Sequence, residues 1–323
     1  MLSRTSLILP LIVCTEMLRA ADPASAFAPW SSVKNYDLEK LARGKVVAEC
    51  NGSMNFARGI SAQAVFIVQA APDAALRSLL ASDPTKRPEQ ETWQRPTFHT
   101  AQDAGFARLK LDLKLPPMRR LIESMRERKG LHLTRDEIAL LPTGDRLDDV
   151  QHFWAELIRQ HWLRWTEKGE LRSTDEFDVR SEIASLLKEE PQIARHFAEL
   201  LTPFTQSGPP PIPAQHYWDL SNVNHSAAVC LGAIYTRAAQ DRLQVLDVSY
   251  YSSSGYLASI TLYEFLPITL DGSTRTLVWE GCMVSAPALA GGLGLKKAIG
   301  SRLMLGDLEK SIHFFQQDVI PSR

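Results

Sequence analysis

The clearest pattern of apolar and polar positions lies in the last third of the chain. Apolar positions recur at the helical period over residues 295–319, which predicts a long amphipathic helix. Four short runs rich in β-branched and aromatic residues precede it, at about residues 227–235, 243–251, 256–265 and 274–285. They predict an antiparallel meander that packs against the helix. A sheet curved over one helix leaves a concave, largely apolar space, which is a usual place for a small hydrophobic ligand.

The first part of the chain carries a shorter set of similar patterns. Two strands are predicted over residues 45–56 and 60–70, and the second is rich in Val, Ile and Phe. Pro72 stands at the first position of a helix predicted over residues 73–81. A further extended run is expected within residues 97–115, where large apolar side chains stand at Phe106, Leu109, Leu111 and Leu113.

Residues 116–204 change to the helical period and predict an all-helical insertion. Residues 205–213 contain a Ser-Gly pair and a proline run, which predicts a stiff linker back to the β-rich part. Both faces of the C-terminal strands are moderately apolar, so we expect the sheet to be covered on both sides. The predicted fold class is α+β, with an antiparallel curved sheet that grips the long C-terminal helix.

The first 26 residues have the features of an export signal. Arg4 precedes a short apolar core at residues 6–14, and small residues follow up to Ala26. Cleavage there would start the mature chain near Phe27, with Ala20 as an earlier alternative site. The apolar run is too short to span a bilayer. We therefore expect an exported protein, periplasmic or secreted, without an integral membrane span in the mature chain; the alternative is a buried or disordered N-terminal segment.

Composition and charge exclude several classes of partner and cofactor. The chain has 323 residues, 45% of them apolar, and a net charge of -1, which is normal for a globular protein and gives no field that attracts nucleic acid. Three cysteines remain in the predicted mature chain: Cys50, Cys230 and Cys282. Their odd number and wide spacing argue against a zinc site or a disulfide framework, although one bridge stays open.

Short catalytic and cofactor-binding motifs are not recognisable. The glycine-rich run at residues 291–297 resembles a phosphate-binding loop, but it lacks the required spacing and the Ser or Thr after the lysine, so a hinge or lid at the helix start is the better interpretation. The eight histidines include no metal-ligand pair, and no nucleophile elbow is present. The sequence therefore predicts neither a metal site nor a cofactor.

Polar and aromatic side chains within the cup-forming strands are the candidate ligand contacts. Tyrosine and tryptophan combine a broad apolar surface with one polar group, which suits a largely hydrophobic ligand with a polar end. Packing across strands explains the same residues equally well. The candidates are Tyr251, Tyr256, Tyr263, Glu264 and Trp279.

Two segments carry a resemblance to a known superfamily. Residues 66–76, with Ala71-Pro72 between strand and helix, and residues 276–287, which lead through Ala286-Pro287 into the final helix, are similar to the helix-grip superfamily of START lipid-transfer domains and polyketide cyclase-like proteins. The resemblance covers about residues 45–115 and 214–320. It implies a helix-grip domain formed by residues 27–115 and 214–323, with residues 116–204 inserted, and a deep cavity for lipids, sterols or polyketide-like molecules.

These observations predict an exported, soluble protein that binds a small hydrophobic molecule or lipid between the sheet and the C-terminal helix. Two alternatives stay open. The first is a cyclase- or hydrolase-type enzyme that uses groups in the same cup, such as Tyr251, Glu264 or His225. The second is a non-catalytic structural or partner-binding protein whose sheet has no cavity.

Overall fold

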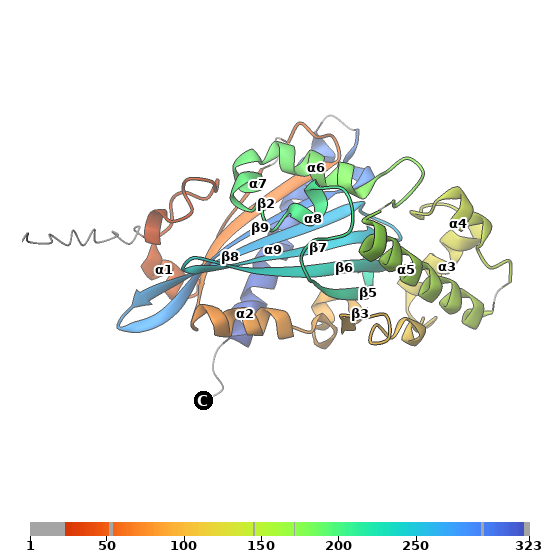
Figure 1. Ribbon diagram of the computed structural model, residues 1–323, viewed down its shortest axis with the longest axis horizontal. Coiled ribbons are helices and arrows are strands. Elements are labelled where there is room, and N and C mark those ends of the chain that lie inside the picture. Colours follow the sequence, from red (N-terminus) through yellow and green to blue (C-terminus); the bar gives the residue numbers. More distant parts are fainter. Residues whose placement is uncertain (1–22, 52–53, 145, 171, 292–293, 320–323) are drawn as a thin grey trace, which may run out of the picture.

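The fold is built on one antiparallel sheet. The computed structural model describes residues 23–51, 54–144, 146–170, 172–291 and 294–319. The sheet is curved and runs in the order β1-β2-β9-β8-β7-β6-β5-β3, with β4 also paired to β5 (Figure 1). Its strands are β1 (Val47–Asn51), β2 (Gly59–Val68), β3 (Thr92–Gln94), β4 (Thr97–Phe98), β5 (Gln215–Val223), β6 (Ser226–Ala239), β7 (Arg242–Ser252), β8 (Ala258–Leu270) and β9 (Ser273–Ser285).

The helices lie on both sides of this sheet. In Figure 1, α6, α7 and α8 lie in front of the strands and α9 passes behind them. Several helices begin with proline in the first turn, where its missing N–H has no intrahelical partner to lose. Their bounds are α1 (Leu38–Ala42), α2 (Pro72–Ala81), α3 (Pro116–Glu127), α4 (Arg135–Ala139), α5 (Leu147–Lys168), α6 (Val179–Glu189), α7 (Pro191–His196), α8 (Thr202–Thr205) and α9 (Leu295–Asp318).

The larger core lies between the sheet and the inserted helices. Alternate strand residues such as Ile67 and Leu262 point toward this side and pack with Trp154, Ile183 and Phe197 of the helical segment. The N-terminal segment joins the same core, because Phe27 and Trp30 are buried in it. The helical layer (residues 116–204 together with this N-terminal segment) therefore closes one face of the sheet.

A smaller core joins α9 and α2 to the opposite face. Ala62 and Ala64 of β2 are small enough for α9 to approach closely, and Phe66 meets Phe315 edge to face with ring centroids 6.1 Å apart. Helix α9 lies mainly against β2 and β1, at one side of the sheet. Helix α2 contacts β9, β8 and β7, which follow β2 in the sheet.

The four C-terminal strands and the final helix are confirmed, residues 116–204 are largely helical as predicted, and the sheet is covered on both faces as expected. The extended run expected within residues 97–115 is wrong beyond β4. There the backbone N–H groups of Lys110 and Leu111 donate to the side chains of Gln94 and Gln151, not to a neighbouring strand. The apolar residues of this segment pack against α5 without joining the sheet. Strand β5 was not predicted.

Two further predictions concern the N-terminal segment and the glycine-rich run before α9. Residues 1–22 of the expected export signal lie outside the described residues, but Phe27 is fully buried and Tyr36 donates its hydroxyl to the carbonyl of Pro23 at 2.8 Å. The folded unit thus includes the residues just before Phe27. In the glycine-rich run, residues 292–293 lie outside the described part, and Lys297 donates to the carbonyls of Met54 and Phe56, which ties the start of α9 to the β1–β2 connection.

Packing of α9 on the sheet predicts that two alanine substitutions in this helix change the free energy of unfolding by different amounts. Ile312 is buried against the sheet and Leu303 is 64% exposed. Ile312→Ala should lower the free energy of unfolding by about 2–5 kcal/mol because it opens a cavity, whereas Leu303→Ala should change it by less than about 0.5 kcal/mol. Urea unfolding measures both values. Equal effects of the two substitutions would contradict this placement of the helix.

Candidate functional site

Polar side chains gather on the α9 side of the sheet, in a region where that face is otherwise apolar. Residues directly across neighbouring strands share a face, and the pairs Asp247–Thr261, Thr261–Cys282 and Tyr263–Glu280 continue the face that carries Val245. On the other side of β7, Asp219 pairs with Cys230. Because side chains alternate between the two faces of a strand, carboxyl, hydroxyl and thiol groups of β5 to β9 lie together on the face that carries α9.

Arg95 is the centre of this cluster. It stands between β3 and β4 and approaches Asp219 at 3.3 Å and Asp247 at 3.6 Å. Its guanidinium also lies 3.8 Å from the centre of the Tyr217 ring, in a cation–π contact. The Tyr217 hydroxyl donates to Asp247 at 2.7 Å, so the four residues form one connected unit.

A glycine makes this arrangement possible. Gly232 of β6 lies directly across from Tyr217, and a Cβ at this position would overlap the Tyr217 ring. Without a side chain at residue 232, the ring lies flat over the β6 backbone and offers its outer face to Arg95. The cluster thus depends on a strand glycine that permits close approach of an aromatic ring.

Burial changes the protonation of the two aspartates. It raises the pKa of Asp219 to about 6 against the opposing effect of Arg95, and it raises the pKa of Asp247 in the same way. The pKa of Arg95 is affected by burial, which lowers it, and by the nearby carboxylates, which raise it above its usual value. Among the described residues, Asp219 Oδ1 is buried and has no hydrogen-bond partner.

Glu280, Cys230 and Cys282 are held in their neutral forms. Burial raises the pKa of Glu280 to about 8, although a hydrogen bond from Tyr263 opposes the shift. Burial also raises the pKa of Cys230 to about 11 and that of Cys282 to about 12. Both thiols are therefore protonated at neutral pH and are poor nucleophiles.

Two adjoining cavities lie beside this cluster. Each has a volume of about 250 Å³, and both are lined by Arg95 and Asp247. We call the two cavities together the sheet groove. One cavity reaches apolar side chains of α2, β6 and β7, namely Leu79, Leu80, Ile234 and Val245. The other, which we call the polar cavity because of its hydroxyl and carboxyl groups, is lined by Tyr217, Asp219, Ser249, Tyr256, Ser259 and Thr261, together with Val284.

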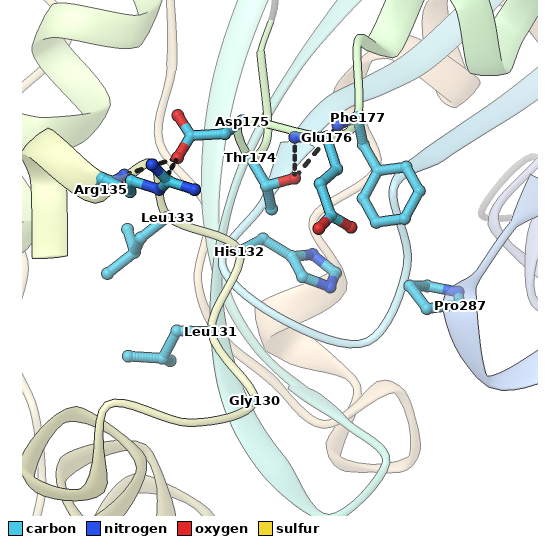
Figure 2. Close-up of a pocket in the computed structure, with 10 residues that line it drawn as sticks. All are labelled: Gly130, Leu131, His132, Leu133, Arg135, Thr174, Asp175, Glu176, Phe177 and Pro287. Carbon is cyan, nitrogen blue, oxygen red and sulfur yellow. Dashed lines mark hydrogen bonds and ion pairs between the residues drawn. The ribbon is translucent and has the colours of Figure 1, made fainter.

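A larger cleft of about 410 Å³ opens at the surface, where residues 130–135 meet residues 174–177 (Figure 2). Its polar groups largely hold the two loops together: Asp175 accepts from the backbone N–H of Arg135, and Thr174 Oγ1 accepts from the backbone N–H groups of Glu176 and Phe177. His132 binds the carbonyl of Ser252, and burial lowers its pKa. The charged side chains that line this cleft, Arg135, Asp175 and Glu176, are exposed, so the sheet groove with its largely buried charges is the stronger candidate.

The structure divides the five sequence-predicted ligand contacts between the two faces. Tyr256 and Tyr263 line the sheet groove. The Tyr256 hydroxyl contacts Ser249 Oγ at 2.9 Å and Cys230 Sγ at 3.3 Å. Two of the five candidates are thus brought together with Arg95.

The other three candidates point into the helical layer. Glu264 is fully buried and binds Arg242 at 2.7 Å, Gln244 at 3.0 Å and His196. Burial would raise its pKa, but these hydrogen bonds and charges bring the pKa below its usual value. Trp279 donates to Ser31 Oγ at 3.0 Å.

A β-bulge explains the position of Tyr251. The β6–β7 register shifts between Leu231 and Gly232, and both Tyr250 and Tyr251 then pack into the core under the helical layer. Tyr251 stacks on His161 with ring centroids 4.1 Å apart. The three residues named for an enzyme do not meet in the groove, because Tyr251 and Glu264 face the helical layer and His225 lies in the β5–β6 turn.

The sequence analysis missed Arg95, Asp219 and Asp247. Asp247 lies on a predicted strand at a position that alternates with apolar residues, so a search for charged residues in phase with Tyr263 would have found it. Asp219 lies on the unpredicted β5. Arg95 lies in a loop, and its contact with residues more than 120 positions away has no local sequence pattern.

No group of three or more His, Cys, Asp or Glu side chains in the described part of the chain is arranged to hold a metal ion. Within the same residues, no helix has the length and apolarity needed to cross a membrane. Comparison of the chain with protein-family models, curated protein sequences and solved structures found no match. The geometry of the groove therefore carries the functional argument alone.

The pKa of Glu280 is raised and that of Glu264 is lowered, so Glu→Gln substitutions at the two positions should change the free energy of unfolding in opposite directions. Glu280 holds a proton in the folded state up to about pH 8, while the unfolded chain releases it near pH 4.5, so wild-type stability falls as the pH rises through this window. Glu280→Gln should remove that loss and raise the free energy of unfolding by about 2–4 kcal/mol at pH 8, with little effect near pH 4.5. Urea unfolding at both pH values measures this.

Glu264→Gln is the matched control, because Glu264 belongs to the cross-strand pair of β8 and β9 that lies next to the pair containing Glu280. The pKa of Glu264 is lowered in the fold, so its carboxylate stabilises the protein above about pH 4.5, and this contribution is lost as the pH falls through the lowered pKa. The substitution should destabilise the protein by about 2–4 kcal/mol at pH 8, because it removes one partner of a buried ion pair. Destabilisation by both substitutions at pH 8 would contradict the assignment of a neutral Glu280.

Proposed function

We propose that this protein binds a small amphipathic molecule in the sheet groove. The observation that carries the proposal is the pair of adjoining cavities that share Arg95 and Asp247, in which apolar side chains such as Leu79 and Val245 lie beside buried charged groups. Pockets with an apolar lining and a few fixed polar groups are the usual form of small-molecule sites. The ligand would place its apolar part toward Leu79 and Val245 and its polar end toward Asp219.

Burial of apolar ligand surface would supply most of the affinity. This contribution is about 25 cal/mol per Å² before the cost of ordering the ligand. The charged cluster is already held by its own contacts, so it would fix the ligand's orientation with little rearrangement. The mechanism is therefore reversible capture.

The helix-grip resemblance is part of this proposal. An antiparallel curved sheet with a long C-terminal helix on one face, and a cavity beside that helix, supports it. The departures are the helical layer on the opposite face and the polar character of the groove. We also propose that the protein is exported. The burial of Phe27 favours Ala20 over Ala26 as the cleavage site, because cleavage after Ala26 would place the new charged N-terminus on a buried residue.

Extraction of the purified protein with organic solvent, followed by mass spectrometry, tests the proposal. The wild-type protein should release a small molecule, and Thr261→Phe should release at least about tenfold less, because a phenyl ring would fill the polar cavity. Thr269→Phe is the matched control: it lies in the same strand on the same face, but it is exposed and outside the groove. Circular dichroism confirms that each variant is folded.

Two outcomes would contradict the proposal. The first is a wild-type protein that releases no small molecule. The second is a folded Thr261→Phe variant that releases as much of it as Thr269→Phe does.

A further inference from the structure

We infer that the sheet groove recognises a cationic group, such as a protonated amine, at the carboxylate of Asp219, on its side away from Arg95. This inference rests on the proposed function and specifies the chemistry of the ligand's polar end. It starts from the charges that line the two cavities. These are one guanidinium, Arg95, and two aspartates, while Glu280 on the next strands is neutral at pH 7.

The residues that line the groove carry one more negative charge than positive charge when both aspartates are ionised. All three side chains are largely buried: 20% of Arg95, 12% of Asp219 and 28% of Asp247 is exposed. An uncompensated charge in such a place is costly, so a ligand that brings one positive charge is favoured over a neutral or negative one.

Asp219 supplies a specific acceptor for this charge. Its Oδ2 contacts Arg95 at 3.3 Å, whereas its Oδ1 has no partner among the described residues and is covered by protein atoms, so the carboxylate must turn to present it to a ligand in the cavity. Ammonium groups offer up to three N–H donors, and a carboxylate oxygen is the strongest acceptor for them. Ser249, Ser259 and Thr261 line the same cavity and provide further hydroxyl acceptors on short side chains that leave space.

Arg95 does not make the groove a site for anions. Two carboxylates and the face of the Tyr217 ring already occupy its guanidinium. An anionic ligand would also have to approach the carboxylates of Asp219 and Asp247, and their negative charges would repel it. The arrangement therefore discriminates between ligands by the sign of their charge.

Three probes of similar size test the inference on the full protein: n-hexylammonium, n-hexanol and n-hexanoate. Titration calorimetry at pH 7 should show that n-hexylammonium binds at least about tenfold more tightly than n-hexanol, and that n-hexanoate binds most weakly, because a hydrogen bond between charged groups is stronger than one between neutral groups. Asp219→Asn should reduce n-hexylammonium affinity by about tenfold and leave n-hexanol affinity within about twofold. The control Asp271→Asn, in an exposed hairpin turn, should change neither affinity.

Each contrary outcome has a distinct meaning. Equal affinities of n-hexylammonium and n-hexanol, or tighter binding of n-hexanoate, would overturn the cationic preference and leave the groove as a binding site. Loss of both affinities in Asp219→Asn, with the fold retained, would likewise overturn it. If none of the three probes binds to the wild-type protein and no small molecule co-purifies, the proposed function fails with the inference. The ranking of the probes on the wild-type chain does not depend on any variant folding.

Discussion

The contact of Arg95 with Asp219 and Asp247 is the interaction on which the candidate site depends. These charges lie on the inner face of a sheet, largely shielded from water, where a single unpaired ion would be strongly disfavoured. Tyr217 joins the cluster through its ring and its hydroxyl, and the absence of a side chain at Gly232 lets the ring lie in place. The polar cavity exists because this cluster holds its side chains at one edge of the open space.

Buried carboxyl groups have different hydrogen-bond partners and protonation on the two faces of the sheet. Under the helical layer, Glu264 accepts hydrogen bonds from Gln244 and Arg242, and both of its oxygens are engaged. On the other face, the cluster leaves one oxygen of Asp219 without a partner among the described residues and keeps Glu280 neutral. Unpartnered polar atoms such as Tyr250 Oη also occur under the helical layer, but Asp219 differs from them because it is a charged group that lines a cavity.

The sequence predicted the architecture better than the site, for a physical reason. Strand alternation and helical period are local patterns, so the four C-terminal strands, α9 and the helical insertion could be predicted from them. The site joins a loop arginine to residues on β5 and β7, and such contacts leave no local pattern. Tyr251 shows a second limit, because one bulge in the β6–β7 pair moves a side chain from the expected face to the other.

A double-mutant cycle on Arg95 and Asp219 tests the central claim most directly. The free energies of unfolding of the wild-type protein, Arg95→Met, Asp219→Asn and the double variant give the coupling between the two side chains. A buried, mutually compensating pair predicts a coupling of about 1–3 kcal/mol at pH 7. Additivity within about 0.5 kcal/mol would show that the two groups do not stabilise each other in the fold, and it would contradict this account of the sheet groove.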